Sequence, residues 1–157
     1  LWLDPANTPA FPPAISAVLS ADLIIVGPGS LYTSILPNLL VRDLAEAVRA
    51  SQAMKFFVCN VATERGETDQ YNCYDHVKTV EEHVGEGMFD LVICNDRFEG
   101  YLGESVEWVR MDMDLLQHVS VYCTNLIDSA HPWRHDAKRL AKTVMDLFFE
   151  RTGPLGS

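Results

Sequence analysis

Three runs of consecutive apolar residues recur along the chain, and amphipathic segments separate them. The runs cover residues 22–26, 55–61 and 90–96, and they are rich in Val, Ile and Phe, which is typical of strands buried on both faces of a parallel sheet. Apolar residues at helical spacing predict helices between the runs, and stretches that alternate with a period of two predict edge strands. The helices are predicted over residues 13–20, 43–51, 75–85 and 135–150, with a further helix capped by Ser30, and the edge strands over 106–110 and 119–123.

Strands and helices that alternate at this spacing predict an α/β fold, a doubly wound and mostly parallel sheet with helices on both faces. The length of 157 residues fits a single α/β domain, which we expect to span residues 1–152. Residues 153–157 match a tag remnant or a native tail. Because the first residue is Leu1 and the chain begins with what resembles a strand end, we expect it to be a piece of a longer protein.

The balance of charges is strongly acidic. Twelve Lys and Arg stand against 22 Asp and Glu, which leaves a formal net charge of −10 and repels nucleic acid and anionic lipid. No apolar run approaches the roughly 20 residues that a membrane helix needs. We therefore expect a soluble protein with neither a nucleic-acid nor a membrane partner.

The four cysteines, Cys59, Cys73, Cys94 and Cys123, show no CxxC spacing, and three of them stand in apolar surroundings. Buried, reduced thiols explain this pattern better than a zinc site or a disulfide framework, which are the two alternatives. We expect thiols in the core, no metal site, and a location in the cytoplasm, where thiols stay reduced.

The first candidate site is the loop that follows residues 22–26. Ligands of doubly wound sheets bind outside the carboxyl ends of the strands, and backbone N–H groups of a loop that opens a helix attract an anion. A phosphate group suits this loop, because its glycines permit close approach and its hydroxyls can donate. A plain turn from strand to helix is the alternative. The candidate residues are Gly27, Gly29, Ser30, Leu31, Tyr32, Thr33 and Ser34.

Two further polar clusters follow later elements. Asn60, Thr63 and Thr68 lie at and after the end of the second apolar run, beside several carboxylates, and a solvated turn is the alternative there. Arg134 and His135 precede the last helix. The planar fork of Arg suits phosphate or carboxylate, although an Arg beside a helix start is commonly a surface residue.

Asp75 and His76 stand at the start of a predicted helix. Such neighbours can act as an acid/base pair, although a His beside a helix cap is commonly structural. The sequence contains no Gly-x-Ser-x-Gly elbow, no HExxH motif and no paired-carboxylate spacing. Hydrolysis by those routes therefore has no residues to carry it.

Residues 21–41 read Ala-Asp-Leu-Ile-Ile-Val-Gly-Pro-Gly-Ser-Leu-Tyr-Thr-Ser-Ile-Leu-Pro-Asn-Leu-Leu-Val. This segment resembles a signature of the gluconeogenesis factors in the CofD/YvcK family, which also includes the 2-phospho-L-lactate transferases of coenzyme F420 biosynthesis. Residues 59–63, 66–69 and 75–76 resemble a second signature, and residues 134–136 a third. The transferases usually read Gly-Pro-Ser-Asn-Pro in the first loop, so the different residues here favour the gluconeogenesis-factor branch.

The resemblance implies a Rossmann-like fold and a regulatory protein that binds a nucleotide sugar, namely a UDP-sugar, and that is linked to carbon metabolism and cell shape. It implies that Arg134 contacts the nucleotide sugar, and Ser30, Thr33 and Asn60 match signature positions. The alternative is a transferase of a phospho-lactyl group, with Mg²⁺ at the diphosphate. NAD or GDP as the ligand, and assembly into a homo-oligomer, are left open.

The sequence departs from the family pattern in two places. Gln70 stands where the family usually has Gly, so we expect a local difference in that turn. The N-terminal Gly-Gly-Gly-Thr-Gly loop of the family, which resembles a first phosphate-binding turn, is absent from this sequence. We expect the ligand site of this chain to lack that contribution.

Overall fold

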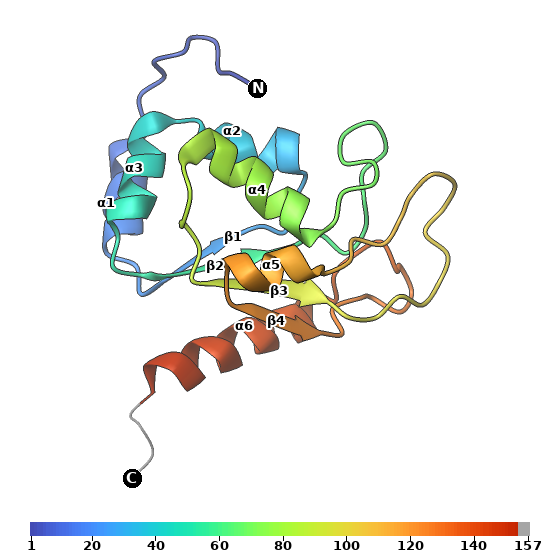
Figure 1. The fold of residues 1–157 in the computed structure, drawn as a ribbon. Coiled ribbons are helices and arrows are strands. Elements are labelled where there is room, and N and C mark those ends of the chain that lie inside the picture. Colours follow the sequence, from blue (N-terminus) through green and yellow to red (C-terminus); the bar gives the residue numbers. More distant parts are fainter. Residues whose placement is uncertain (154–157) are drawn as a thin grey trace.

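The computed structural model describes residues 1–153 (Figure 1), and residues 154–157 of the expected tag or tail lie outside the described part. Four strands form one sheet in the order β1-β2-β3-β4, and each neighbouring pair is parallel. Their carboxyl ends therefore meet at one edge of the sheet, as predicted. The strands are β1 (Leu23–Val26), β2 (Met54–Val58), β3 (Leu91–Asn95) and β4 (Val121–Thr124).

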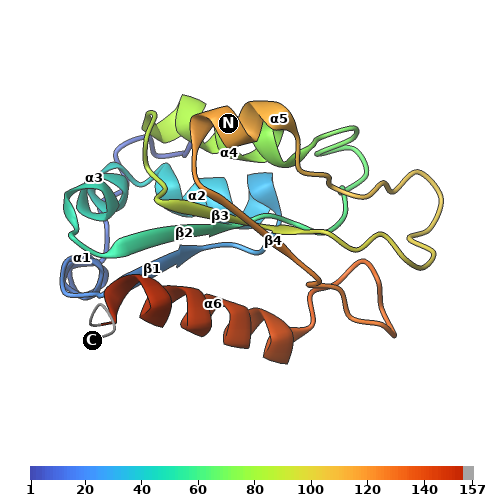
Figure 2. The same ribbon diagram turned by 60° about the horizontal axis from the view of Figure 1, so that its bottom comes forward.

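Helices cover both faces of the sheet, which confirms the predicted α/β class. α6 (Ala137–Thr152) lies under one face, whereas α2 (Leu36–Leu39), α4 (Cys73–Val84) and α5 (Met113–His118) lie over the other (Figure 2). α1 (Pro12–Leu19) and α3 (Arg42–Ala50) pack on each other. A π-helix, η1 (Leu31–Ile35), runs directly into α2. Among residues 1–153, no helix has both the length and the hydropathy that crossing a bilayer requires.

The two central strands fill the core on both sides, as their apolar sequences predict. Alternate side chains point to opposite faces of a strand, so Phe57 and Val92 belong to the layer under α4, while Phe56 and Ile93 pack with Val144 of α6. Each of these strand side chains is fully buried. Burial of one such side chain contributes about 1.5–3 kcal/mol to the stability of the fold, so this core holds the strand ends in place.

β1 is less buried than its sequence predicts. Ile25 is 46% exposed, because β1 is the outermost strand and β2 is its neighbour on one side. The prediction that residues 22–26 are buried on both faces is therefore wrong within the described sheet. An apolar sequence of this kind shows that a strand can be buried on both faces, whereas its place in the sheet decides whether it is.

The segment between β3 and β4 differs most from the prediction. Residues 106–110 do not form a strand, since Trp108 makes only an isolated bridge to Ala62. Alternation predicts an extended backbone, but a strand also needs a neighbour to pair with, and β4 follows β3 directly in the sheet. The short helix α5 was not predicted; Asp112 caps it by accepting a hydrogen bond from the Leu115 N–H at 3.1 Å.

The four cysteines are free thiols. Cys59 and Cys94 are buried in the layer under α4, as their apolar neighbours in the sequence predict. Cys73 is buried there too, whereas Cys123 is only half-buried beside them. Cys94 and Cys123 face each other across β3 and β4. Interaction with the Cys94 thiol, and then burial, raise the pKa of Cys123. These thiols therefore act as small apolar side chains at neutral pH.

Candidate functional site

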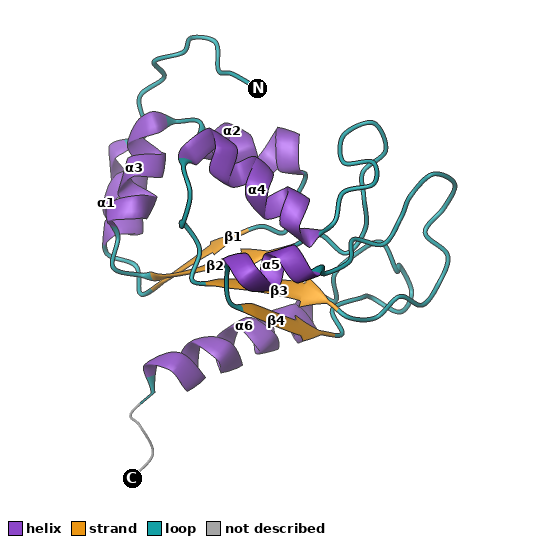
Figure 3. Ribbon diagram, in the orientation of Figure 1, coloured by secondary structure: helices purple, strands orange, loops and turns teal. Residues whose placement is uncertain are grey.

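The loops that leave the carboxyl ends of the strands gather at one end of the sheet (Figure 3) and enclose a cavity of about 1020 Å³. This is the place at which ligands bind to doubly wound sheets. Four segments line the cavity: Pro28, Gly29 and Ser30 after β1; Asn60, Val61, Ala62, Thr63, Glu64 and Arg65 after β2; Tyr101, Leu102, Gly103 and Val106 after β3; and Trp133, Arg134 and His135 before α6.

Gly27 sets the direction in which the chain leaves β1. Its φ of +85° is a conformation that side chains rarely adopt, and a Cβ atom there would lie 2.6 Å from the backbone oxygen of Val58. Only glycine fits both requirements. Gly27 therefore shapes the loop, while the cavity itself begins at the next residue.

Ser30 caps the helical run that starts with η1. Its Oγ accepts hydrogen bonds from the Thr33 N–H at 3.2 Å and from the Thr33 hydroxyl at 2.6 Å, and it donates to Glu67 Oε2 at 2.9 Å. The hydroxyls of Ser30 and Thr33 are thus engaged within the protein, with each other and with Glu67 of the second loop. The predicted cap is confirmed, and Thr33 lies outside the cavity lining.

Asn60 joins the first two loops to each other. Its Oδ1 accepts a hydrogen bond from the Gly29 N–H at 3.2 Å, and its Nδ2 donates to the Gly29 oxygen at 3.0 Å and to Glu64 Oε1 at 3.4 Å. Both backbone groups of Gly29 are therefore engaged. Asn60 holds the loop in position, and its side chain borders the cavity while doing so.

Three other candidates serve the fold more than the cavity. Leu31 is fully buried in the core, and the Tyr32 hydroxyl lies 2.8 Å from that of Tyr71. Burial and this neighbour raise the pKa of Tyr32 to about 12. Ser34 lines, together with Gly27, a separate groove of about 320 Å³ beside β1.

The threonines of the second loop are also engaged within the protein. Thr63 Oγ1 accepts a hydrogen bond from the Glu107 N–H at 2.9 Å, and Thr68 Oγ1 accepts one from the Glu64 N–H at 2.8 Å. Both threonines are buried, and Thr63 alone of the two borders the cavity. These bonds fix the loop on which Glu64 and Arg65 are carried.

Glu64 brings a carboxyl group to the cavity wall. Burial, and then the negative charge of Glu67, raise the pKa of Glu64. A carboxyl group in such surroundings holds its proton more readily than an exposed one and can exchange it with a bound molecule.

Arg134 and His135 meet the cavity from the segment before α6. The backbone of Arg134 is fixed by bonds of its N–H to the His131 oxygen at 2.8 Å and of its oxygen to the Asp128 N–H at 2.9 Å. Within residues 1–153, no hydrogen bond or ion pair engages its guanidinium, so the fork is available to a ligand. His135 Nε2 lies 3.1 Å from the Cys59 oxygen, and burial lowers the pKa of His135.

The pair Asp75 and His76 does not form an acid/base site. Asp75 completes a capping box at the start of α4, where its carboxylate accepts from the Asn72 N–H at 2.9 Å. His76 is 1% exposed, donates from Nδ1 to the Asn72 oxygen at 2.8 Å, and lies outside the cavity lining. Burial lowers its pKa. Both residues are structural, the alternative that the sequence left open.

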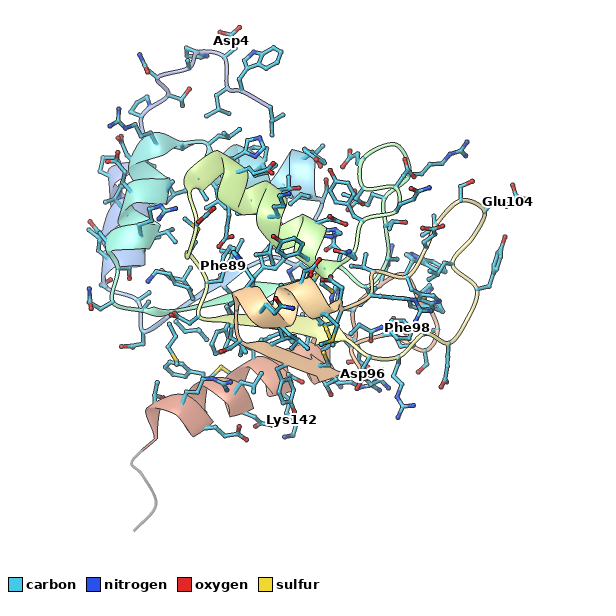
Figure 4. The ribbon with its side chains drawn as sticks, in the orientation of Figure 1. Asp4, Phe89, Asp96, Phe98, Glu104 and Lys142 are labelled. Carbon is cyan, nitrogen blue, oxygen red and sulfur yellow. The ribbon has the colours of Figure 1, made fainter. Side chains whose placement is uncertain are left out.

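Sequence reasoning missed one side of the cavity, which the segment 101–106 and Trp133 form. Phe98, Asp96 and Glu104 mark this long connection in Figure 4, with Glu104 at its outer tip. A signal existed in Gly100 and Gly103, since glycines so close together are typical of a loop, and both have positive φ angles, +107° and +103°. Tyr101 at 75% and Trp133 at 47% exposure present aromatic surface here.

A metal centre is not assembled from this part of the chain. Among residues 1–153, no three His, Cys, Asp or Glu side chains converge as ligands for a metal ion.

Residues 1–147 match the family described as 2-phospho-L-lactate transferase CofD. The chain is 48% identical over 95 residues to the gluconeogenesis factor of Listeria innocua, which covers 60% of this chain and 30% of that protein. It is 36% identical over 165 residues to the gluconeogenesis factor of Bacillus subtilis, covering 96% of this chain and 50% of that protein.

A solved structure shares the fold. The crystal structure of a UPF0052 family member from Bacillus halodurans matches with a TM-score of 0.85 and 34% sequence identity, over 92% of this chain and 49% of that one. The chain thus spans about half the length, or less, of the relatives that it matches.

Proposed function

The chain belongs to the CofD family, and we propose that it binds a nucleotide sugar in the cavity at the carboxyl ends of its strands. Gluconeogenesis factors are among the relatives of this chain. By analogy with them, we propose that the protein regulates carbon metabolism and cell shape. A UDP-sugar is the proposed ligand. Its binding would be passed on through a partner protein in the cytoplasm.

One observation carries the proposal: the unengaged guanidinium of Arg134 borders a large cavity in a chain whose net charge is −10. Arg65 borders the same cavity. Cations placed at a hollow of an otherwise acidic protein favour an anionic ligand, and Arg matches the geometry of phosphate. The apolar side chains of Leu102 and Val106 on another wall suit the less polar part of a nucleotide.

A ligand panel tests the proposal. We expect UDP-sugars to raise the melting temperature of the protein more than GDP, NAD or a deazaflavin acceptor does. A ligand at a hundred times its dissociation constant stabilises the folded state by about 2.7 kcal/mol. Calorimetric titration should then give one site per chain, and the absence of any UDP-sugar binding would refute the proposal.

A second candidate function is transfer of a phospho-lactyl group, after the description of the family. The raised pKa of Glu64 at the cavity wall favours it, because such a carboxylate can take a proton from an attacking hydroxyl group. Release of a nucleotide from an activated lactyl donor, abolished by Glu64→Gln, would support this function over the regulatory one.

A further inference from the structure

His135 lines the cavity, and its surroundings determine which of its ring nitrogens carries the proton. Its Nε2 lies 3.1 Å from the backbone oxygen of Cys59. A carbonyl oxygen only accepts hydrogen bonds, so Nε2 carries the proton. Burial lowers the pKa of His135 below its ordinary value of 6.5, so the ring is neutral at pH 7. A neutral imidazole has one donor and one acceptor, and Nδ1 is therefore the acceptor.

The acceptor nitrogen is accessible and has no partner within residues 1–153. Within residues 1–153, no protein group bonds to Nδ1 of His135, whose hydrogen bond to Cys59 is made by Nε2. Nor is Nδ1 enclosed, since the buried, unpartnered side-chain nitrogen of the described chain is Nε2 of His76. His135 itself lines the cavity. Its lone pair is available to whatever occupies that space.

We propose that His135 reads a hydroxyl or N–H group of the ligand, and that it does not hold phosphate. The oxygens of an ionised phosphate are acceptors, so they cannot bond to the lone pair of Nδ1. Arg134, the adjacent residue, offers only donors. The two neighbours therefore divide the ligand between them: Arg134 binds the diphosphate, and His135 binds a donor group beside it.

This role rests on the proposed binding of a nucleotide sugar, and it narrows the part assigned to His135. Hydroxyl donors occur both on the ribose and on the sugar, and uracil adds an N–H group. All three share the chemistry that Nδ1 recognises. A ligand that consists of phosphate alone has no donor to offer, and this difference supplies the test.

The experiment compares three probes, UDP-glucose, UDP and inorganic pyrophosphate, by calorimetric titration. We expect His135→Phe to weaken UDP-glucose binding by about three- to tenfold, which is the contribution of one neutral hydrogen bond, and to leave pyrophosphate binding unchanged. His135→Asn should recover part of the loss, because the Asn Oδ1 stands near the former Nδ1 position and accepts. His83→Phe, a change on α4 outside the cavity lining, is the control.

Comparison of the three probes shows which part of the ligand carries the donor group that His135 binds. Equal losses for UDP and UDP-glucose place it on the uridine part, and a loss confined to UDP-glucose places it on the sugar. An equal loss for pyrophosphate, or no loss with any probe, overturns the role of His135. Unchanged melting temperatures of the unliganded variants show that the fold is retained.

Nuclear magnetic resonance of the imidazole nitrogens gives a reading that does not depend on the ligand. We expect a proton on Nε2 and none on Nδ1 at pH 7, and a proton on Nδ1 instead overturns the inference even if nucleotides bind. If the expected tautomer is found and the wild-type protein binds no UDP-glucose, the proposed function fails, and the role of His135 fails with it.

Discussion

The segments 27–34 and 101–106 both border the cavity, but their side chains are used in opposite ways. In the first segment the polar groups are consumed within the protein: Ser30 bonds to Glu67 and Thr33, and both backbone groups of Gly29 bond to Asn60. In the second segment Tyr101 is 75% exposed. The comparison separates residues that shape a site from residues that meet its ligand, and both kinds lie on loops.

The largest expected effect concerns the shaping residues. Gly27→Ala should lower the free energy of unfolding by about 2–6 kcal/mol, because the positive φ is strained and the new Cβ meets the Val58 oxygen at 2.6 Å. Gly103→Ala is the matched control, since its φ of +103° is strained too but no atom lies within 4 Å of the new Cβ. It should cost about 1–3 kcal/mol. Urea denaturation measures both, and equal losses would contradict the distinction.

Arg134→Ala tests a residue that we expect to contact the ligand. Loss of a hydrogen bond to a charged group is worth about 1.5–3 kcal/mol, so UDP-sugar affinity should fall about ten- to a hundredfold with unchanged stability. If the contact is exposed, the loss should shrink at high salt. Arg97→Ala, on the exposed connection after β3, is the control. Calorimetry at two salt concentrations measures both variants, and unchanged affinity would make Arg134 a plain surface residue.

Gly29→Val tests whether Gly29 serves to shape the site or to leave room for the ligand. A Cβ at Gly29 meets only the Ser34 Cβ, at an ordinary 3.4 Å, so the fold should tolerate it. Gly29 is one of the residues that line the cavity, and crowding at this position should weaken ligand binding by about tenfold. Titration and thermal melting of the same variant decide the case: parallel losses of affinity and stability would show that Gly29 belongs with the shaping residues.

The smallest effect is expected from Glu64→Gln. Burial and the charge of Glu67 raise the pKa of Glu64 from its ordinary 4.5, so this carboxyl favours the folded state at low pH, and that contribution is lost as the pH rises through the raised pKa. The variant should melt about 1–2 °C higher than wild type at pH 7 and no higher at pH 3. A melting series across this range checks the sign, and a lower melting temperature at pH 7 would reverse it.

The sequence predicted the architecture well, because the main strands and helices are specified locally. The runs at 55–61 and 90–96 have the apolar sequence that is typical of strands buried on both faces, and Ser30 stands where a helix cap belongs. The prediction that β1 is buried on both faces was wrong, since such burial depends on the position of a strand in the sheet. The edge strand at 106–110 was wrong because alternation does not provide a partner.

The candidate site was predicted in part. Of the predicted residues, the cavity brings together Gly29, Ser30, Asn60, Thr63, Arg134 and His135, and it leaves out Gly27, Leu31, Tyr32, Thr33, Ser34 and Thr68. A polar residue in a loop looks the same in sequence whether it bonds to a neighbour or awaits a ligand. The wall at 101–106 was missed, because long-range packing alone places it against the other loops.

The cysteines allow the opening of the protein to be followed in time. Cys123 on β4 is half-buried, and Cys59 lies fully enclosed in the core. A reagent that alkylates thiols reaches the first when β4 frays and the second only when the core comes apart. Mass spectrometry of the two sites at successive times would therefore yield one rate for a local motion and another for global unfolding, from the natural chain and without an introduced label.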